Sequence, residues 1–189
     1  MMAYSIIQPP FTLRFREMPK GELKRYFQWF MKVMPERLVE LDAVVRETHP
    51  TWPGDFSPES LQELAAWFGG QVETRPKTGE EIDGLTAKLA FSIDVSGTQL
   101  TNRTFSLAMD IGMYFSQVVI NNLDGTRWDQ PLKNERFADY GQPVITGFGT
   151  VSLNPVRIVV TTAYGVARGK KAQLRELYDT WAKMKRHDG

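Results

Sequence analysis

The pattern of apolar and polar positions predicts a mainly helical chain organised around residues 101–122. Within this stretch, apolar side chains recur every three or four residues, and a second apolar row runs beside the first. The two rows comprise Phe105, Leu107, Ala108, Ile111, Tyr114, Phe115, Val118 and Val119. A helix that is apolar around so much of its circumference is usually surrounded by other elements. We therefore expect 101–122 to be a central buried helix.

Asp110 and Gly112 interrupt the apolar pattern of this helix. Asp110 is either a buried acid with a raised pKa, and so a candidate base, or an acceptor of hydrogen bonds from a neighbouring segment. The second interpretation is favoured, because the sequence has no second acid or histidine at helical spacing from Asp110. Gly112 is a poor helix former, by about 1 kcal/mol relative to alanine. We expect it to let another backbone approach closely.

The N-terminal third predicts a strand followed by helix. Residues 11–16 alternate between apolar and polar, which is typical of a half-buried strand. From Glu22 the period becomes helical, and Pro35 marks either a kink or the first turn of a second helix that reaches about Thr48. Residues 1–54 are then either part of one domain over 1–189 or a helical-hairpin lobe. The aromatic and methionine face of 22–34 is interpreted as core, with a ligand or peptide groove as the alternative.

Capping and turn residues place the remaining helices. Ser57-Pro58 and Asn154-Pro155 predict helices over 57–69 and 154–166. Residues 173–185 have a clear amphipathic pattern and predict a closing helix. Residues 71–79 are interpreted as a linker. Thr78 is expected to cap a short helix over 80–89, in competition with an extended segment over 90–97.

A small sheet is expected between the central helix and the last two helices. Asp124-Gly125 predicts a turn after the central helix. Strands over 126–131 and 143–148 would then form an antiparallel hairpin joined by a polar loop, with 11–16 as a further strand. The expected fold class is α+β, mainly helical, with helices packed around the central helix and a small antiparallel sheet.

Composition removes several function classes. The 189 residues include no cysteine and only two histidines, and the net charge is +1. Disulfides, thiol catalysis and cysteine-ligated metals are excluded, and a histidine-based metal site or triad is not expected. The weak net charge gives no reason to expect nucleic acid as a partner. The sequence shows neither a secretory signal nor a membrane-spanning apolar run, so we expect a cytoplasmic protein without membrane association.

The candidate binding site surrounds the predicted hairpin. Polar and aromatic residues on a loop carried by a rigid scaffold are where binding usually occurs. The candidates are Arg127, Trp128, Asp129, Lys133, Tyr140 and Gln142. The alternative is a surface loop with one tryptophan buried in the core. The sequence offers no catalytic residues, no metal ligands and no cofactor motif; Gly147-Phe148-Gly149 lacks the lysine and further glycine of a phosphate loop.

The order of motifs resembles a group of uncharacterised bacterial cytoplasmic proteins over roughly residues 55–185. The motifs are TFSLAMDIGMYFSQVVINN, a turn with RW, DYGQPVITGF, LNPVRIVVTTAYGV and LRELYDTWAKM. The resemblance implies helices over 101–122 and 154–166, and it brings no established activity or catalytic residue. Immunity proteins to bacterial toxins are one class that it suggests by analogy.

These observations favour a non-enzymatic cytoplasmic binding protein whose partner is another protein, of accessory or immunity type, with a homodimer as a further possibility. The alternative is a small-molecule-binding protein or a hydrolase that uses Asp110 or Asp129 together with Arg127. That alternative predicts a deep pocket that holds both an acid and a base.

Overall fold

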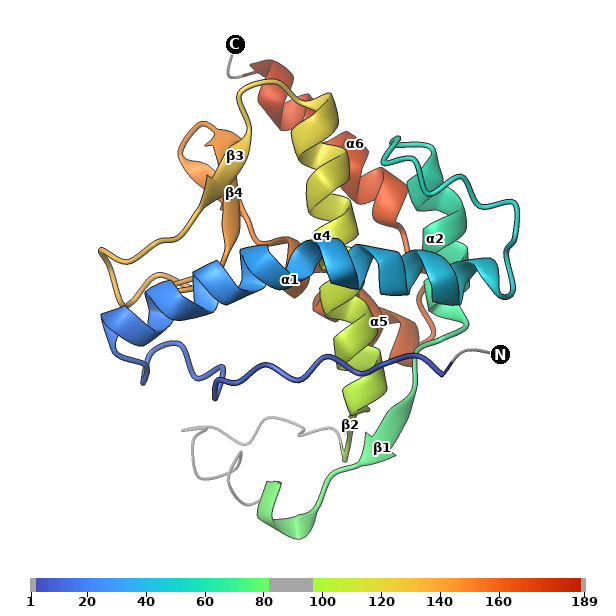
Figure 1. Cartoon of the computed structure of the whole chain (residues 1–189), viewed down its shortest axis with the longest axis horizontal. Coiled ribbons are helices and arrows are strands. Elements are labelled where there is room, and N and C mark those ends of the chain that lie inside the picture. Colours follow the sequence, from blue (N-terminus) through green and yellow to red (C-terminus); the bar gives the residue numbers. More distant parts are fainter. Residues whose placement is uncertain (1–2, 82–96, 188–189) are drawn as a thin grey trace.

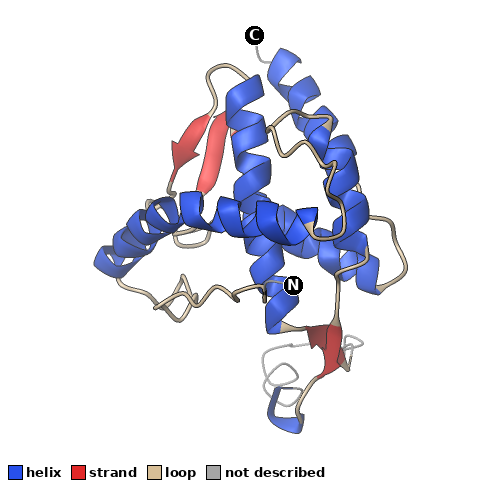
Figure 2. Cartoon of the chain, turned by 45° about the vertical axis from the view of Figure 1, so that its right-hand side comes forward, coloured by secondary structure: helices blue, strands red, loops and turns tan. Residues whose placement is uncertain are grey.

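The computed structural model describes residues 3–81 and 97–187, which form a mainly helical α+β fold (Figures 1 and 2). The helices are α1 (Lys20–Arg46), α2 (Ser60–Gly69), α4 (Asn102–Asn122), α5 (Pro155–Ala167) and α6 (Leu174–His187). The strands are β1 (Thr74–Pro76), β2 (Thr98–Leu100), β3 (Arg127–Asp129), β4 (Val144–Phe148) and β5 (Val151–Leu153). The expected fold class is confirmed.

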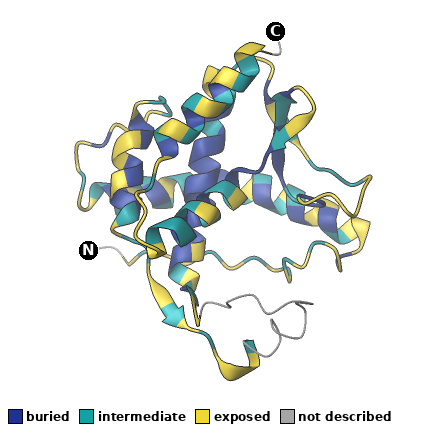
Figure 3. Ribbon diagram, turned by 180° about the vertical axis from the view of Figure 1, so that it is seen from behind, coloured by how far each residue is buried: buried dark blue, intermediate teal, exposed yellow. Residues whose placement is uncertain are grey.

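Helix α4 lies at the centre and is buried along most of its length, as predicted (Figure 3). Thr101 caps its first turn, because the Thr101 hydroxyl accepts a hydrogen bond from the backbone N–H of Thr104 at 3.2 Å. The helix ends before the predicted turn, where Gly125 has a φ of 75°. Helices α1, α2, α5 and α6 and the sheet containing β4 contribute buried residues to the core around α4.

Helices α4 and α5 pack so closely that only glycine fits at their contact. A Cβ atom at Gly112 would lie 2.9 Å from the Cα of Val156 and 3.0 Å from its nitrogen. The expected close approach at Gly112 is therefore present. Asn154 caps α5 as predicted, with its side-chain oxygen accepting from the Arg157 N–H at 3.0 Å.

Helix α1 is continuous through Pro35 and crosses α4 (Figures 1 and 2). The prediction of a second helix that begins at Pro35 is wrong, so residues 20–46 form no helical hairpin. The interpretation of the aromatic and methionine face as core is confirmed. Together with Met18 and residues of α4 and the loop after β3, this face forms a buried cluster of Met18, Leu23, Tyr26, Phe30, Met34, Met109, Met113 and Tyr140.

The predicted strand over 11–16 is wrong. Residues 3–18, here called the N-terminal strap, instead cross α4 as an irregular extended segment and run antiparallel to α1 (Figure 1). The Ser5 N–H donates to Glu40 at 2.6 Å, and Phe11 and Phe15 pack against Tyr26. Leu13 has a φ of 58°, which interrupts any strand.

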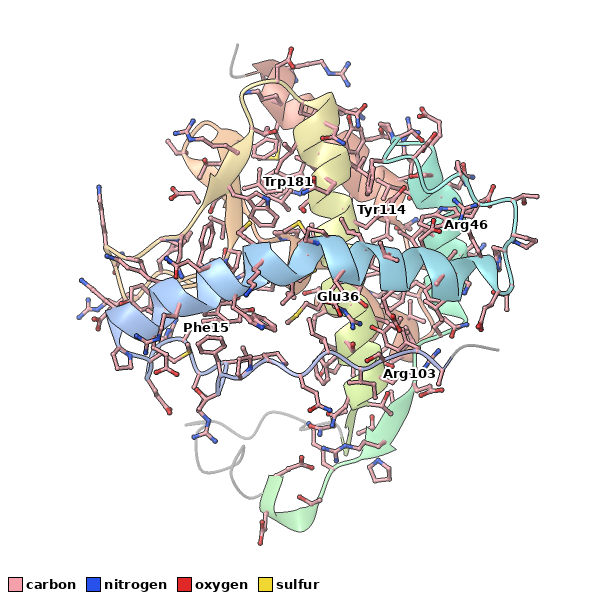
Figure 4. The ribbon with its side chains drawn as sticks, viewed as in Figure 1. Phe15, Glu36, Arg46, Arg103, Tyr114 and Trp181 are labelled. Atoms are coloured by element: carbon pink, nitrogen blue, oxygen red, sulfur yellow. The ribbon has the colours of Figure 1, made fainter. Side chains whose placement is uncertain are left out.

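The small sheet contains three strands in the order β3-β4-β5, all antiparallel. Strands β3 and β4 lie inside the predicted ranges 126–131 and 143–148, with Trp128 opposite Ile145. The third strand is β5 rather than 11–16, and it pairs with β4 across an irregular register. Helix α6 covers this sheet: the rings of Phe148 and Trp181 meet edge to face with centroids 4.9 Å apart (Figure 4).

The predicted linker contains β1, which pairs with β2 in a separate two-stranded antiparallel sheet. Ser57 accepts the Ser60 N–H at 3.2 Å, and α2 begins at Ser60 rather than Ser57. Thr78 and Glu81 form reciprocal side-chain to backbone hydrogen bonds, the predicted cap. Most of the predicted helix 80–89 and of the extended segment 90–97 lies outside the described residues.

Candidate functional site

The six predicted site residues do not form one surface. Arg127, Asp129 and Lys133 are exposed, whereas Tyr140 is buried, with 3% of its surface accessible. Trp128 is partly buried, and its ring meets Phe30 edge to face with centroids 5.6 Å apart. Successive side chains of a strand point to opposite faces, so β3 turns its tryptophan inward and its two charged residues outward.

Gln142 is half-buried and connects the loop to the start of α5. Its side-chain oxygen accepts a hydrogen bond from Asn154 at 2.8 Å, and it lies beside the start of α5. Trp128, Tyr140 and Gln142 therefore hold the hairpin on the helices. Arg127, Asp129 and Lys133 are the predicted residues that remain accessible to a partner.

The loop over 130–143 is fixed to α1 by backbone contacts. The side-chain amide of Gln130 donates to the carbonyl of Leu23 at 2.7 Å and to that of Gly141 at 2.8 Å. The Gly141 N–H donates to the Pro131 carbonyl at 2.8 Å, which closes the loop at its base. Gly141 has a φ of 74°, and a Cβ there would lie 2.6 Å from a methyl of Leu23. Glycine is thus required at this contact.

The same loop is fixed to α5 by a buried carboxylate. Asp139 accepts hydrogen bonds from Asn154 at 2.9 Å and pairs with Arg157 at 2.9 Å. Asn154 in turn caps α5. The loop is therefore held at both ends by hydrogen bonds to two different helices, while residues 133–138 are exposed.

A shallow depression of about 450 Å³ lies against this loop. It is lined by Asp129, Gln130, Pro131, Leu132, Lys133, Asn134 and Phe137. Phe137 is 39% exposed and was not among the predicted site residues, although an aromatic residue in the polar stretch 133–138 was the available signal. We call Arg127, Asp129, Lys133 and Phe137 the loop surface.

Asp110 is buried in a polar cluster beneath the N-terminal strap. It has no accessible surface, and its two carboxylate oxygens accept from the Arg37 Nε at 2.8 Å and Nη2 at 2.7 Å. The Tyr4 hydroxyl also donates to Asp110 and shares a hydrogen bond of 2.7 Å with Ser106. These contacts correspond to the hydrogen-bond acceptor role favoured for Asp110.

Burial and pairing act in opposite directions on this cluster. Burial raises the pKa of Asp110, and the hydrogen bonds from Arg37 and Tyr4 oppose that shift. Burial disfavours the charge of Arg37, but Asp110 outweighs this effect, so the pKa of Arg37 is raised and the guanidinium keeps its proton. With both oxygens engaged and no access to solvent, Asp110 is poorly placed to act as a base.

Within residues 3–81 and 97–187, no three histidine, aspartate or glutamate side chains gather in a way that could hold a metal ion. The helices of these same residues include none with the length and apolar character needed to span a bilayer. No family model, no curated protein and no solved structure matches the chain. The resemblance to uncharacterised bacterial proteins therefore stays a prediction.

Proposed function

We propose that the protein is a non-enzymatic cytoplasmic binding protein that recognises another protein through the loop surface. The observation that carries the proposal is the combination of a long, exposed loop with a rigidly held base. Loops of this length without secondary structure are commonly functional when they occur inside a folded domain. Because hydrogen bonds to α1 and α5 already fix this loop, less conformational entropy is lost when a partner binds.

The lining of the depression suggests the chemistry of the partner. Pro131, Leu132 and Phe137 supply an apolar floor, with Asp129 and Lys133 as charges of opposite sign beside it. An apolar centre with a polar rim is the usual anatomy of a protein interface. We propose a partner that inserts an apolar side chain and carries both charges around it. The apolar contact should change little with salt, whereas the contacts of Asp129 and Lys133 should weaken as salt screens them.

The hydrolase alternative receives less support from the geometry. Asp110 is enclosed and paired with Arg37. Arg127 and Asp129 are both exposed on β3, where water would weaken their electrostatic effect on a substrate.

Site-specific photocrosslinking tests the proposal. A photoreactive phenylalanine analogue replaces Phe137, and irradiation in cell lysate should attach one dominant protein to the chain. The same analogue at Val39, an exposed apolar position on α1 (70% accessible), is the control and should not capture that protein. Lys133→Ala should reduce the yield at position 137. Tyr140 is unsuitable for this test, because its loss would disturb the core.

Two results would contradict the proposal. One is that the analogue at position 137 captures the same set of proteins as the analogue at position 39. The other is a product that contains only two copies of this chain, which would assign the loop surface to a homodimer instead.

A further inference from the structure

A cavity of about 220 Å³ lies where the N-terminal strap meets the helices. The strap, α1, α4, the end of the loop over 130–143 and the start of α5 all contribute to its walls. The lining residues are Leu13, Phe15, Tyr26, Phe105, Met109, Gln142, Pro143, Asn154, Val156 and Val160. In Figure 4, Phe15 lies between the strap and α1, on one side of this space. The cavity shares no residue with the loop surface.

The walls of this cavity are apolar and uncharged. None of the described residues that line it carries a charge at neutral pH. The polar atoms of Asn154 are already engaged, because it donates to Asp139 and Gln142 and accepts from Arg157. An ionised ligand would lose its hydration here without gaining an opposite charge, which is costly.

Tyr26 provides a hydrogen-bonding group that the protein leaves unused. The residue is only 2% exposed, and burial alone shifts its pKa, with no contribution from a hydrogen bond to its hydroxyl among the described residues. Fully enclosed side-chain nitrogens and oxygens in the described part of the chain all have partners. The Tyr26 hydroxyl must therefore retain some accessible surface, and Tyr26 is one of the residues that line the cavity. Burial raises the pKa of Tyr26, so the hydroxyl keeps its proton.

A second groove lies beside the cavity. It has a volume of about 500 Å³ and follows the strap from Ile6 to Pro9 along the side of α4. Leu13, Phe105 and Met109 line both the groove and the cavity. The two spaces are thus neighbours, and Leu13 belongs to an irregular segment that no β-ladder holds in place.

We propose that this cavity binds a small neutral molecule with one ring and one hydrogen-bonding group, of the phenol class, with that group on the Tyr26 hydroxyl. The size follows from cavity volume, since an apolar cavity of about 150 Å³ accommodates benzene. A volume of about 220 Å³ then suits a ring with a few further atoms. The neutral charge follows from the uncharged walls.

Phenol and toluene are the probes that test this proposal, because they have nearly the same shape and differ in the hydroxyl. Titrations followed by NMR of the whole chain should show that both bind, and that phenol binds more tightly. Tyr26→Phe should weaken phenol about 2- to 13-fold, the range for one hydrogen bond, and leave toluene unchanged. Benzoate, a charged ring of similar size, should not bind.

A second variant locates the binding. Val160→Trp fills the cavity from α5 and should abolish the binding of both probes. Val39→Trp makes the same substitution on the exposed side of α1 and should leave both affinities unchanged. If Val160→Trp does not fold, Met109→Trp provides the same test from α4. The proposal is overturned if neither probe binds at millimolar concentration, if the folded cavity-filling variant still binds, or if Tyr26→Phe weakens both probes equally.

Discussion

The pair of Arg37 and Asp110 shows what single residues of this chain contribute. The sequence indicated that Asp110 accepts hydrogen bonds, because no other catalytic group lay at helical spacing. It could not identify the partners, since Arg37 is 73 residues away and Tyr4 is 106 residues away. Spacing within one helix constrains only residues of that helix, whereas contacts between elements depend on how the elements pack.

Replacing Arg37 with methionine should destabilise the protein by about 3–5 kcal/mol. The change leaves the Asp110 carboxylate buried without its counter-ion. The free-energy cost of that unpaired buried charge exceeds the net contribution of the ion pair to stability. Urea denaturation at pH 7 measures the difference. Arg46→Met is the matched control, because Arg46 pairs with Asp42 on the surface, and it should have a much smaller effect. Equal losses in the two variants would contradict this account.

Tyr26 should make stability depend on alkaline pH. Burial raises its pKa above the ordinary value near 10, so the folded state holds the proton more strongly than the unfolded chain. The contribution of Tyr26 is complete below about pH 10 and is lost as the pH rises toward the folded pKa. Urea denaturation of wild type and Tyr26→Phe should give similar stabilities at pH 7. At pH 11 the variant should lose less stability than the wild type; an identical loss would refute the role of Tyr26.

At the scale of elements, strong local signals predicted most of the helices and the strands of the hairpin, whereas the second helix expected at Pro35 and the strand expected over 11–16 were wrong. Asn154 caps α5 as its sequence position indicated. Residues 11–16 do alternate between half-buried and exposed, but the strap achieves this against α1 without a neighbouring strand. Period-two burial is therefore not sufficient evidence for a strand. Strands β1, β2 and β5 span three residues each, and β3 is equally short, but the Asp124-Gly125 turn signal marked the position of β3.

Gly112→Ala should destabilise the contact between α4 and α5 by about 1–3 kcal/mol. Alanine favours helix by about 1 kcal/mol relative to glycine, but its methyl group would overlap the backbone at Val156. Thermal unfolding measures the result. Gly165→Ala in α5 is the control, because a Cβ atom at this position would meet nothing closer than 3.7 Å. This substitution should therefore stabilise the protein slightly. The packing argument fails if both substitutions shift the melting temperature in the same direction.

At the scale of the whole molecule, the sequence identified the region of the candidate site but not its orientation. Arg127, Asp129 and Lys133 are exposed as expected for binding residues, whereas Tyr140 and Gln142 face the helices. The alternation of side chains along β3 could have separated Trp128 from its neighbours in advance. The burial of Tyr140 could not have been foreseen, because it depends on how the loop packs on α1.

The N-terminal strap should open without unfolding the rest of the molecule. Tyr4→Phe removes hydrogen bonds to Asp110 and Ser106 and so weakens the attachment of the strap to α4. Trypsin should then cleave after Arg14 and Arg16 faster than in the wild type, as measured by mass spectrometry over time. Cleavage after Lys170 and Lys171, between α5 and α6, is the internal control. Equal acceleration at both places would indicate general destabilisation instead.

Helix α6 has a consequence for the biosynthesis of this chain. Its buried face packs on α2, and Arg175 of α6 pairs with Glu59, which lies 116 residues earlier. While the ribosome is still adding residues between these positions, the part of α2 that α6 later covers is exposed, and so is the face of β4 that Trp181 later contacts. The nascent chain therefore exposes apolar surface throughout that interval. Its hydrophobic core is complete only after Ala182 has left the ribosome.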